Sequence, residues 1–359
     1  MKRFWKIDDW VSVWHFVILG AVAAIVVGAA VMFFGLYNVS ARVGHWPGVS
    51  WVLHTTFGNS VSLRADAEVP EDLLSEDRIA LGARHYETAC TACHGRPGEA
   101  QSATTLAMVP QPPHVTEFAG EWPAEEFHWI VHEGIKMSGM PAWPAEREDD
   151  VWPVVAFLEV GDMSGADYAA LTERPDGQYC AMCHGLDGVS GNAWIPRLDI
   201  LSAEYMAAAL DAYRLGLRDS GIMHQAASLL PPASDDAVLE AYLGEVGPAN
   251  GEAPDAALAE TGRALAFAEA GSGDIPACRA CHGPWEAPLD ESFPSLAGQY
   301  APYLEQQLTL WRDGARGGSR VAELMHAAAA ELTDDDIAAL AAWYASLPPA
   351  RLNDVREAE

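Results

Sequence analysis

The sequence has few basic residues. Among its 359 residues, 21 are Lys or Arg and 51 are Asp or Glu, which gives a net charge of −30 with His neutral. Phosphate recognition requires a basic surface, so this composition excludes a nucleic-acid-binding protein. A disordered acidic chain is also excluded, because 13 Trp, 10 Tyr and 10 Phe give the chain much apolar surface to bury. The length predicts two to three folded domains.

Several catalytic and nucleotide-binding motifs are absent. The sequence contains no Walker loop, no G-x-G-x-x-G ahead of a helix and no Ser-His-Asp elbow. His128 and His132 are four residues apart, but they are not part of H-E-x-x-H, and packing of Trp129 and Ile130 explains that segment better. Alternating strand patterns are also scarce, so the sequence predicts an all-α fold.

Charged residues are absent from residues 11–37. At about 1.5 Å per residue, a helix of this length reaches about 40 Å, enough to cross a bilayer with some tilt. Lys2, Arg3 and Lys6 precede it, so the positive-inside rule predicts a single-pass inner-membrane protein with a cytoplasmic N-terminus and a periplasmic remainder. A cleaved signal peptide is the alternative, but the run is about twice the usual apolar length and no small-x-small cleavage site follows.

No cysteine lies outside one repeated pattern. The six cysteines form three C-x-x-C-H motifs, each followed by Gly: Cys90, Cys93 and His94; Cys180, Cys183 and His184; Cys278, Cys281 and His282. In this pattern two thiols on one helical turn form thioethers with haem vinyl groups and the His ligates iron, which predicts three covalently bound haem c groups. Disulfide bonds are an alternative, but they would not require a His after each cysteine pair. A zinc site would combine cysteine pairs from separate motifs and leave one pair unused. Thioredoxin-like motifs need a βαβ pattern around them, which is not found here.

The last two motifs lie in an internal repeat. An offset of 98 residues aligns His184 with His282 and also the following pairs: Pro196 and Pro294, Leu198 and Leu296, Tyr205 and Tyr303, Arg214 and Arg312, Arg218 and Arg316. Segments 164–250 and 251–348 are therefore two copies of one domain. A Met-His pair recurs in both copies, as Met223-His224 and Met325-His326.

Helices are predicted at the ends of the three haem-binding segments. Acidic residues precede closing helices at 151–160, 237–246 and 337–347, with Ser234 and Thr333 as N-caps of the last two. Helices at 78–89 and 256–270 precede the first and third motifs, whereas the opening of the second copy is shorter and is interrupted by Pro175.

These features together resemble class I cytochrome c over about residues 70 to 348. The tandem copies resemble periplasmic diheme cytochromes, through Tyr303-Leu304-x-x-Gln307-Leu308 and Arg312-x-Gly314-x-Arg316. The first segment, with Gly139-Met140-Pro141-Ala142-Trp143, resembles the cytochrome c domains of oxidase and dehydrogenase subunits. The resemblance implies a membrane-anchored triheme cytochrome in which a small helical wrap surrounds each haem.

The predicted organisation has seven parts. They are a cytoplasmic N-terminus (1–10), a transmembrane anchor (11–37), a juxtamembrane linker (38–69), the first module (70–163), the second module (164–250), the third module (251–348) and a tail (349–359). Each module is expected to be a class I cytochrome c-like domain.

The resemblance also implies the axial ligands. The expected pairs are His94 with Met140, His184 with Met223, and His282 with Met325. His/Met ligation saturates the iron and favours one-electron transfer. Met137 is the alternative to Met140, and His224 and His326 are alternatives to the Met that each follows.

Prolines and arginines are the expected supporting groups. A Pro carbonyl is expected to hold each His ring: Pro196 and Pro294 lie 12 residues after their His, and Pro112 and Pro113 lie 18 and 19 after His94. Haem propionates are expected to pair with arginines, with surface ion pairs as the alternative: Arg214, Arg218, Arg312 and Arg316.

The predicted function is single-electron transfer between respiratory redox partners, without catalysis by this chain. The preferred hypothesis is a donor to, or subunit of, a terminal oxidase, and the alternative is the cytochrome subunit of a membrane-associated dehydrogenase. A haem enzyme such as a peroxidase would need an open iron position and distal acid or base groups. The predicted partners are redox proteins and, through the anchor, membrane lipid. The acidic surface predicts a basic docking face on a redox partner, with adaptation to high salt as the alternative.

Overall fold

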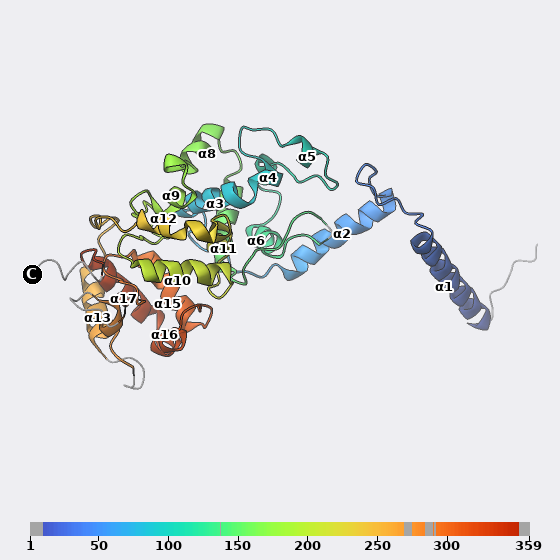
Figure 1. Cartoon of the computed structure of the whole chain (residues 1–359). Helices are drawn as coiled ribbons and strands as arrows, with labels where there is room; N and C mark the ends of the chain where they lie inside the picture. The colour runs from blue at the N-terminus through green and yellow to red at the C-terminus, as the bar shows by residue number, and fades with distance from the viewer. Residues whose placement is uncertain (1–9, 137, 269–274, 284–289, 291, 352–359) are drawn as a thin grey trace, which may run out of the picture.

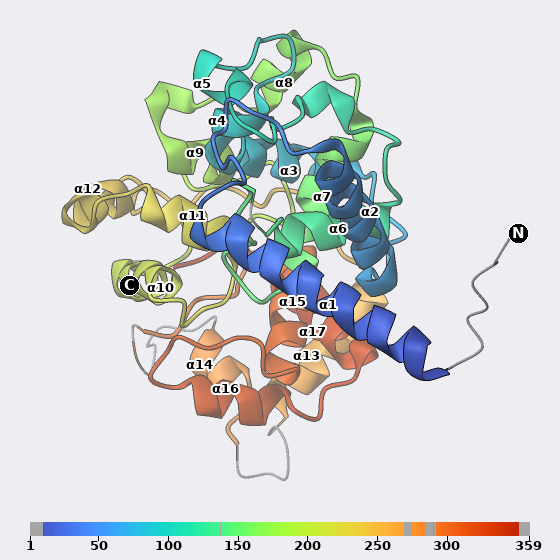
Figure 2. The same ribbon diagram turned by 90° about the vertical axis from the view of Figure 1, so that its right-hand side faces the viewer.

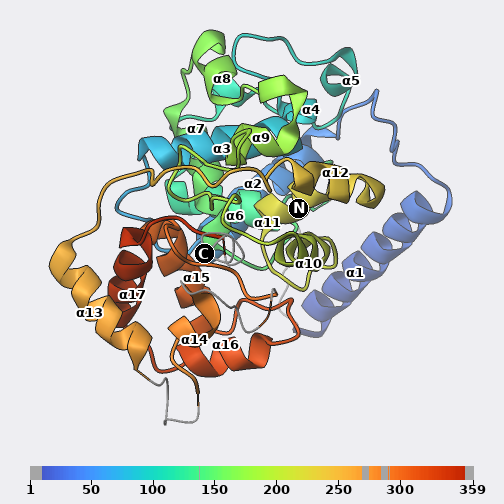
Figure 3. The same cartoon turned by 60° about the vertical axis from the view of Figure 1, so that its left-hand side comes forward.

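The computed structural model describes residues 10–136, 138–268, 275–283, 290 and 292–351. Within these ranges the regular elements are α-helices and short 3-10 helices, and no strand occurs. The all-α prediction is therefore confirmed. Figures 1 and 3 show α10 (Ala203–Arg214), α11 (Gly221–Ser228) and α12 (Asp235–Glu240) of the second module between the first module and the helices of the third.

Helix α1 (Trp10–Phe33) stands outside the folded body (Figures 1 and 2). Its segment Val13–Phe33 is long and apolar enough to cross a membrane, and none of it is buried by the rest of the chain. The helix ends four residues before the predicted end of the anchor at Tyr37. It agrees with a single-pass membrane anchor.

The linker contains a helix that the sequence analysis did not predict. Helix α2 (Pro47–Arg64) begins with Pro at its first position, where no N–H is needed. Its C-terminal half packs on α6 (Ala124–Glu133), where the Ser62 hydroxyl donates to Glu126 at 2.6 Å. Trp51 in its N-terminal half is exposed. The linker is thus a helix that extends from the body (Figure 1).

The first and third modules are each closed by two crossing helices. Helix α3 (Glu76–Ala89) crosses α7 (Trp152–Val160), and α13 (Ala256–Phe267) crosses α17 (Asp334–Ser346). At the crossings a Cβ on Gly82 would overlap the Pro153 carbonyl oxygen, and one on Gly262 would overlap that of Ala339. The four predicted helices are found, but α13 ends at Phe267, since Ala268 is extended; residues 269 and 270 of the predicted 256–270 helix lie outside the described residues.

The second module is closed differently. Its opening helix α8 (Gly165–Leu171) packs on α3 of the first module. Tyr168 belongs to the same core as Tyr86 and Phe157, and its hydroxyl donates to Glu87 at 2.8 Å. The residues expected to open the second module therefore pack in the core of the first.

The closing helix of the second module is shorter than predicted. Helix α12 (Asp235–Glu240) replaces the expected 237–246 helix, because Gly244, Gly247 and Pro248 disfavour its continuation. Ser234 stands at the predicted N-cap position of α12 but makes no side-chain capping bond. Thr333 does cap α17, in a reciprocal capping box with Asp336, which confirms the prediction for the third module.

Candidate functional site

The three C-x-x-C-H motifs have the same local structure. Each His ends a short helix: α4 (Thr91–His94), α9 (Tyr179–His184) and α14 (Arg279–His282). The next residue is in each case a Gly with positive φ, namely Gly95 at 72°, Gly185 at 75° and Gly283 at 77°. Glycine adopts this conformation without the strain that a Cβ would cause, which explains the Gly after each motif.

Each motif His is oriented by a proline carbonyl. The Nδ1 to oxygen distances are 2.9 Å for His94 and Pro113, 3.0 Å for His184 and Pro196, and 3.0 Å for His282 and Pro294. A carbonyl only accepts, so Nδ1 carries the hydrogen and the Nε2 lone pair is left for a metal. In the first module the carbonyl belongs to Pro113, whereas that of Pro112 accepts from Gln101.

Burial keeps the three motif rings neutral. It lowers the pKa of His94, His184 and His282, and the hydrogen bond to the proline carbonyl opposes this only in part. A neutral imidazole is the form that ligates iron. The electrostatics of the three sites therefore suit a metal bound at Nε2.

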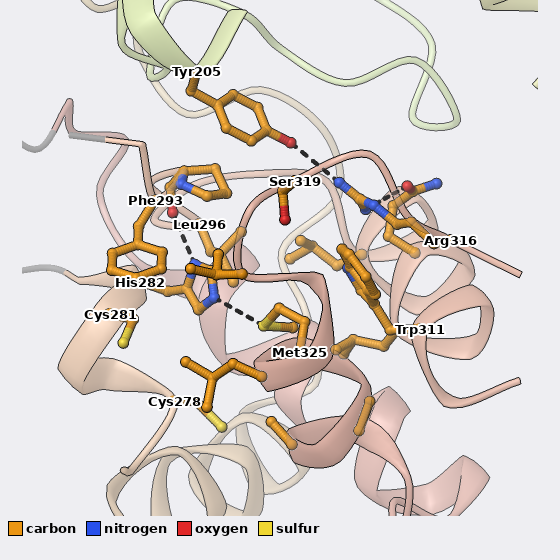
Figure 4. A pocket seen from close by; sticks show the side chains of 18 of the residues that line it. Tyr205, Cys278, Cys281, His282, Phe293, Leu296, Trp311, Arg316, Ser319 and Met325 are labelled. Atoms are coloured by element: carbon orange, nitrogen blue, oxygen red, sulfur yellow. Dashed lines mark hydrogen bonds between the residues drawn. The ribbon is translucent and has the colours of Figure 1, made fainter. Parts of the chain in front are cut away.

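The pocket of the third module brings the predicted ligand atoms together. Met325 lies on α16 (Ala322–Ala329), and its Sδ is 3.4 Å from His282 Nε2 (Figure 4). Cys278 and Cys281 line the same cavity. The donor set of one imidazole, one thioether and two thiols therefore fits a covalently attached haem.

The alternative ligand in the third module is engaged elsewhere. His326 Nδ1 donates to the Trp311 carbonyl at 3.0 Å, and the His326 ring packs edge-on against the indole. The ring is thus occupied by a contact with α15 (Ala301–Arg312).

The pocket of the second module is lined by all three modules. Its own contribution includes Cys180, Cys183, His184 and Met223, the last on α11 (Gly221–Ser228). The other two modules contribute Arg78, Leu81, Arg147, Asp149, Asp150, Pro153, Tyr303, Gln306 and Gln307. This shared lining was not predicted, because only tertiary packing brings these residues together.

Met140 lies in a tight turn of the first module. Its N–H donates to the Ser138 hydroxyl at 3.0 Å, and its carbonyl accepts from the Ile135 N–H at 3.1 Å. The Met108 methyl group contacts Gly139, so a methionine that the sequence analysis did not single out packs beside this turn. Met137, the alternative ligand, lies outside the described residues.

The four predicted propionate partners divide into two kinds. Arg214 and Arg312 form ion pairs with Asp235 and Asp334 at 2.5 and 2.7 Å, as the ion-pair alternative expected. Arg218 donates to Tyr303 and Gln307, and Arg316 donates to Tyr205. Neither of these two has a carboxylate within 4.0 Å among the described residues.

The two remaining arginines create a positive region between the second and third pockets. Burial alone would raise the pKa of Tyr205 on α10 (Ala203–Arg214), but the charges of Arg218 and Arg316 lower it (Figure 4). The buried Arg316 Nε has no hydrogen-bond partner among the described residues. An anionic group such as a propionate fits this chemistry.

Comparisons with known proteins agree with this geometry. Residues 77–158 match the family model described as cytochrome c oxidase, cbb3-type, subunit III, and residues 259–348 match the model described as cytochrome c. A "Thiosulfate dehydrogenase electron acceptor" of Thiomonas intermedia (strain K12) is 38% identical over 204 residues, which cover 55% of this chain and 93% of the relative.

Two further relatives match a similar share of the chain. A protein of the same description from Stutzerimonas stutzeri (strain A1501) is 35% identical over 55% of this chain and 94% of its own length. A "Cytochrome c4" of Azotobacter vinelandii is 31% identical over 47% of this chain and 84% of its own length.

Proposed function

The chain belongs to the cytochrome c family, and from this premise we propose that it is a membrane-tethered carrier that accepts electrons from a dehydrogenase. It binds three haem c groups covalently and is a non-catalytic electron carrier, as its relatives are. When bound, haem c supplies a one-electron redox centre. The two relatives described as electron acceptors of thiosulfate dehydrogenase carry the proposal, because each matches over more than 90% of its length.

The proposed attachment and ligand residues are those of the three motifs and three methionines. The six thiols form the thioethers, and the axial pairs are His94 with Met140, His184 with Met223, and His282 with Met325. The proline hydrogen bonds to all three rings support the His ligands. The 3.4 Å approach of Met325 to His282 supports the thioether in the third module.

The remaining side chains hold the group and exclude water. Arg218 and Arg316 pair with haem propionates between the second and third modules. This pairing offsets the cost of burying the propionate charges away from water. If Met140, Met223 and Met325 ligate the iron together with their His, no iron position would be open, and the peroxidase alternative would lack a reactive site.

The proposed topology places α1 in the inner membrane. Lys2, Arg3 and Lys6 precede the apolar run, which supports a cytoplasmic N-terminus and three periplasmic modules. The partner is then a periplasmic or membrane-bound redox protein, and the acidic surface favours a basic docking face on it.

A terminal oxidase is the second candidate partner, as the recipient of the electrons. The match of residues 77–158 to a module of a cbb3-type oxidase subunit supports it. Under this proposal the first module, which follows the anchor, donates electrons to the oxidase.

Electron transfer from a purified enzyme tests the proposal. The full-length haem-loaded chain in mild detergent is mixed with thiosulfate dehydrogenase and thiosulfate, and haem reduction is followed by stopped-flow absorbance. We expect reduction that depends on both additions and slows as salt is raised, because screening weakens docking between opposite charges. The proposal fails if dithionite reduces the haems but the dehydrogenase does not. Oxygen consumption by a cbb3-type oxidase with the reduced chain as donor tests the second candidate.

Single substitutions test the axial ligands. Met140→Ala, Met223→Ala and Met325→Ala should each remove one of three equivalents of the red absorption band that a Met sulfur gives ferric haem. Met32→Ala is the control, since Met32 is exposed on helix α1 and lines neither the second nor the third pocket. An assignment is overturned if its variant retains the full band.

A further inference from the structure

Helix α11, which carries Met223, begins at a hydrogen-bonded contact with the first module. The buried Asp150 carboxylate accepts from the Ile222 N–H at 3.2 Å and from the Ser220 hydroxyl at 3.0 Å. The Ser220 oxygen in turn accepts from the Met223 N–H at 3.3 Å. A carboxylate 70 residues upstream thus caps the first turn of α11.

Close packing at the same helix start reinforces the contact. A Cβ on Gly221 would overlap the Trp143 indole, so only Gly allows the first module to approach α11 this closely. The Arg147 guanidinium donates to the Asp219 carbonyl at 3.3 Å. Farther along α11, the Gln225 amide donates to the Thr88 carbonyl at 3.1 Å. The first module therefore contacts α11 on both sides of Met223.

Among the described residues, no side chain caps the corresponding helix of the third module in this way. Helix α16 begins after Val321, which makes no side-chain capping bond. The second module also lacks the helix crossing that closes the third, because α8 packs on α3. The dependence on the first module is therefore specific to the second haem site.

We propose that Asp150 is a positioning residue for Met223, and that the first module thereby completes the second haem site. The carboxylate accepts from the Ile222 N–H, orients the Ser220 hydroxyl that accepts from the Met223 N–H, and complements the positive end of the helix. These contacts fix the first turn and the Met223 backbone within it. The inference rests on Met223 as the proposed axial ligand and is independent of which redox protein is the partner.

Absorbance of the full-length haem-loaded chain in detergent tests the inference. We expect Asp150→Ala to lose one of three equivalents of the ferric Met–haem band, while Asp150→Asn, which keeps the size and one acceptor oxygen, retains most of it. Asp219→Ala is the control from the same contact, because the Asp219 side chain accepts from the Glu146 N–H instead of capping α11. It should keep the band. Unchanged absorbance in Asp150→Ala, or equal loss in Asp219→Ala, overturns the proposal.

Amide hydrogen exchange provides a second readout that does not depend on the haem spectrum. In Asp150→Asn, exchange of the Ile222 amide should be about three- to tenfold faster, as expected for a weakened helix cap. Amides of α16 should be unchanged and serve as the internal control. Equal protection of Ile222 in both proteins would overturn the inference, even if Asp150→Ala fails to fold. Loss of one equivalent of the band in Met223→Ala tests whether Met223 is the ligand, independently of whether Asp150 positions it.

Discussion

The second and third modules are copies in sequence but are stabilised by different contacts. The third is closed by its own crossing of α13 and α17, with Gly262 at the contact. In the second, α8 packs in the core of the first module and α11 is capped by Asp150. The haem motif and its His–Pro bond are retained in both, so the motif His is held in the same way while the surrounding contacts differ.

A buried ion pair distinguishes the second module further. Arg197 and Asp199 are 0% exposed and form two hydrogen bonds of 2.8 and 2.6 Å. At the same offset of 98, the third module has Ser295 and Ala297. The Arg197 guanidinium also donates to the carbonyls of Gly247 and Pro248, which follow the short α12. The ion pair therefore holds the chain after α12 in place, whereas in the third module the longer helix α17 occupies the corresponding part of the repeat.

Breaking this ion pair should have the largest effect on stability. Asp199→Ala leaves a buried unpaired guanidinium and should lower the free energy of unfolding by about 3 to 5 kcal/mol. The double variant Arg197→Met/Asp199→Leu, which removes both charges, should recover most of the loss. Denaturant unfolding followed by circular dichroism measures both. Equal losses in the single and double variants would contradict this explanation.

The second largest loss of stability is expected when the crossing of α13 and α17 in the third module is disturbed. Gly262→Ala places a methyl group against the Ala339 carbonyl and should cost about 2 to 3 kcal/mol through displacement of α13. Gly244→Ala in the second module is the control, because a Cβ there meets no atom within 4 Å. Hydrogen exchange in α13 should rise only in the first variant. Similar exchange in both would mean that the crossing is not tightly packed.

Acid should destabilise the first module at His85, beside the Trp143 that packs against Gly221 of α11. Burial lowers the pKa of His85, which packs against Trp143, from 6.5 to about 4. Between these values the unfolded chain binds the extra proton, so this His contributes stability above pH 6.5 that is lost as pH falls toward 4. The loss at pH 5 should be about 2 kcal/mol.

Unfolding at pH 7 and pH 5 measures this effect. Between pH 7 and pH 5, the free energy of unfolding should fall by about 2 kcal/mol less in a His85→Gln variant than in the original chain. Arg218, between the second and third modules, stays charged over this range, because burial lowers its pKa less than the neighbouring tyrosines raise it. An equal pH dependence in the two proteins would exclude His85 as its source.

The smallest difference concerns the helix caps. Thr333→Ala should destabilise the third module by about 1 kcal/mol, because the Thr333 hydroxyl accepts from the Asp336 N–H. Ser234→Ala should have almost no effect, since Ser234 makes no capping bond to α12. Thermal unfolding of both variants makes the comparison. A larger loss in Ser234→Ala would contradict the described cap geometry.

The parts of the fold that the sequence predicts are those set by local patterns. The helices around the first and third motifs, the Gly after each motif and the cap at Thr333 depend on neighbouring residues, and all are found. The proline carbonyls at 12 residues after His184 and His282 were also predictable from the repeat.

The parts that it does not predict depend on distant partners. Arg214 and Arg218 are the same residue type in the same repeat, yet one pairs with Asp235 and the other lies in a pocket wall. Asp150 follows an acidic neighbour before a helix, a local pattern that does not reveal a contact with the start of α11. No local pattern shows that α8 joins another module's core.

The wall between the second and third pockets limits how the two sites can change independently. Within the described part of the chain, six side chains line both cavities: Leu201, Tyr205, Ala209, Arg218, Tyr303 and Gln307. A substitution at any of these positions changes the surroundings of both sites at once. A change confined to one of the two sites therefore requires a substitution at a residue that lines only that pocket, such as Met206 in the second or Trp311 in the third.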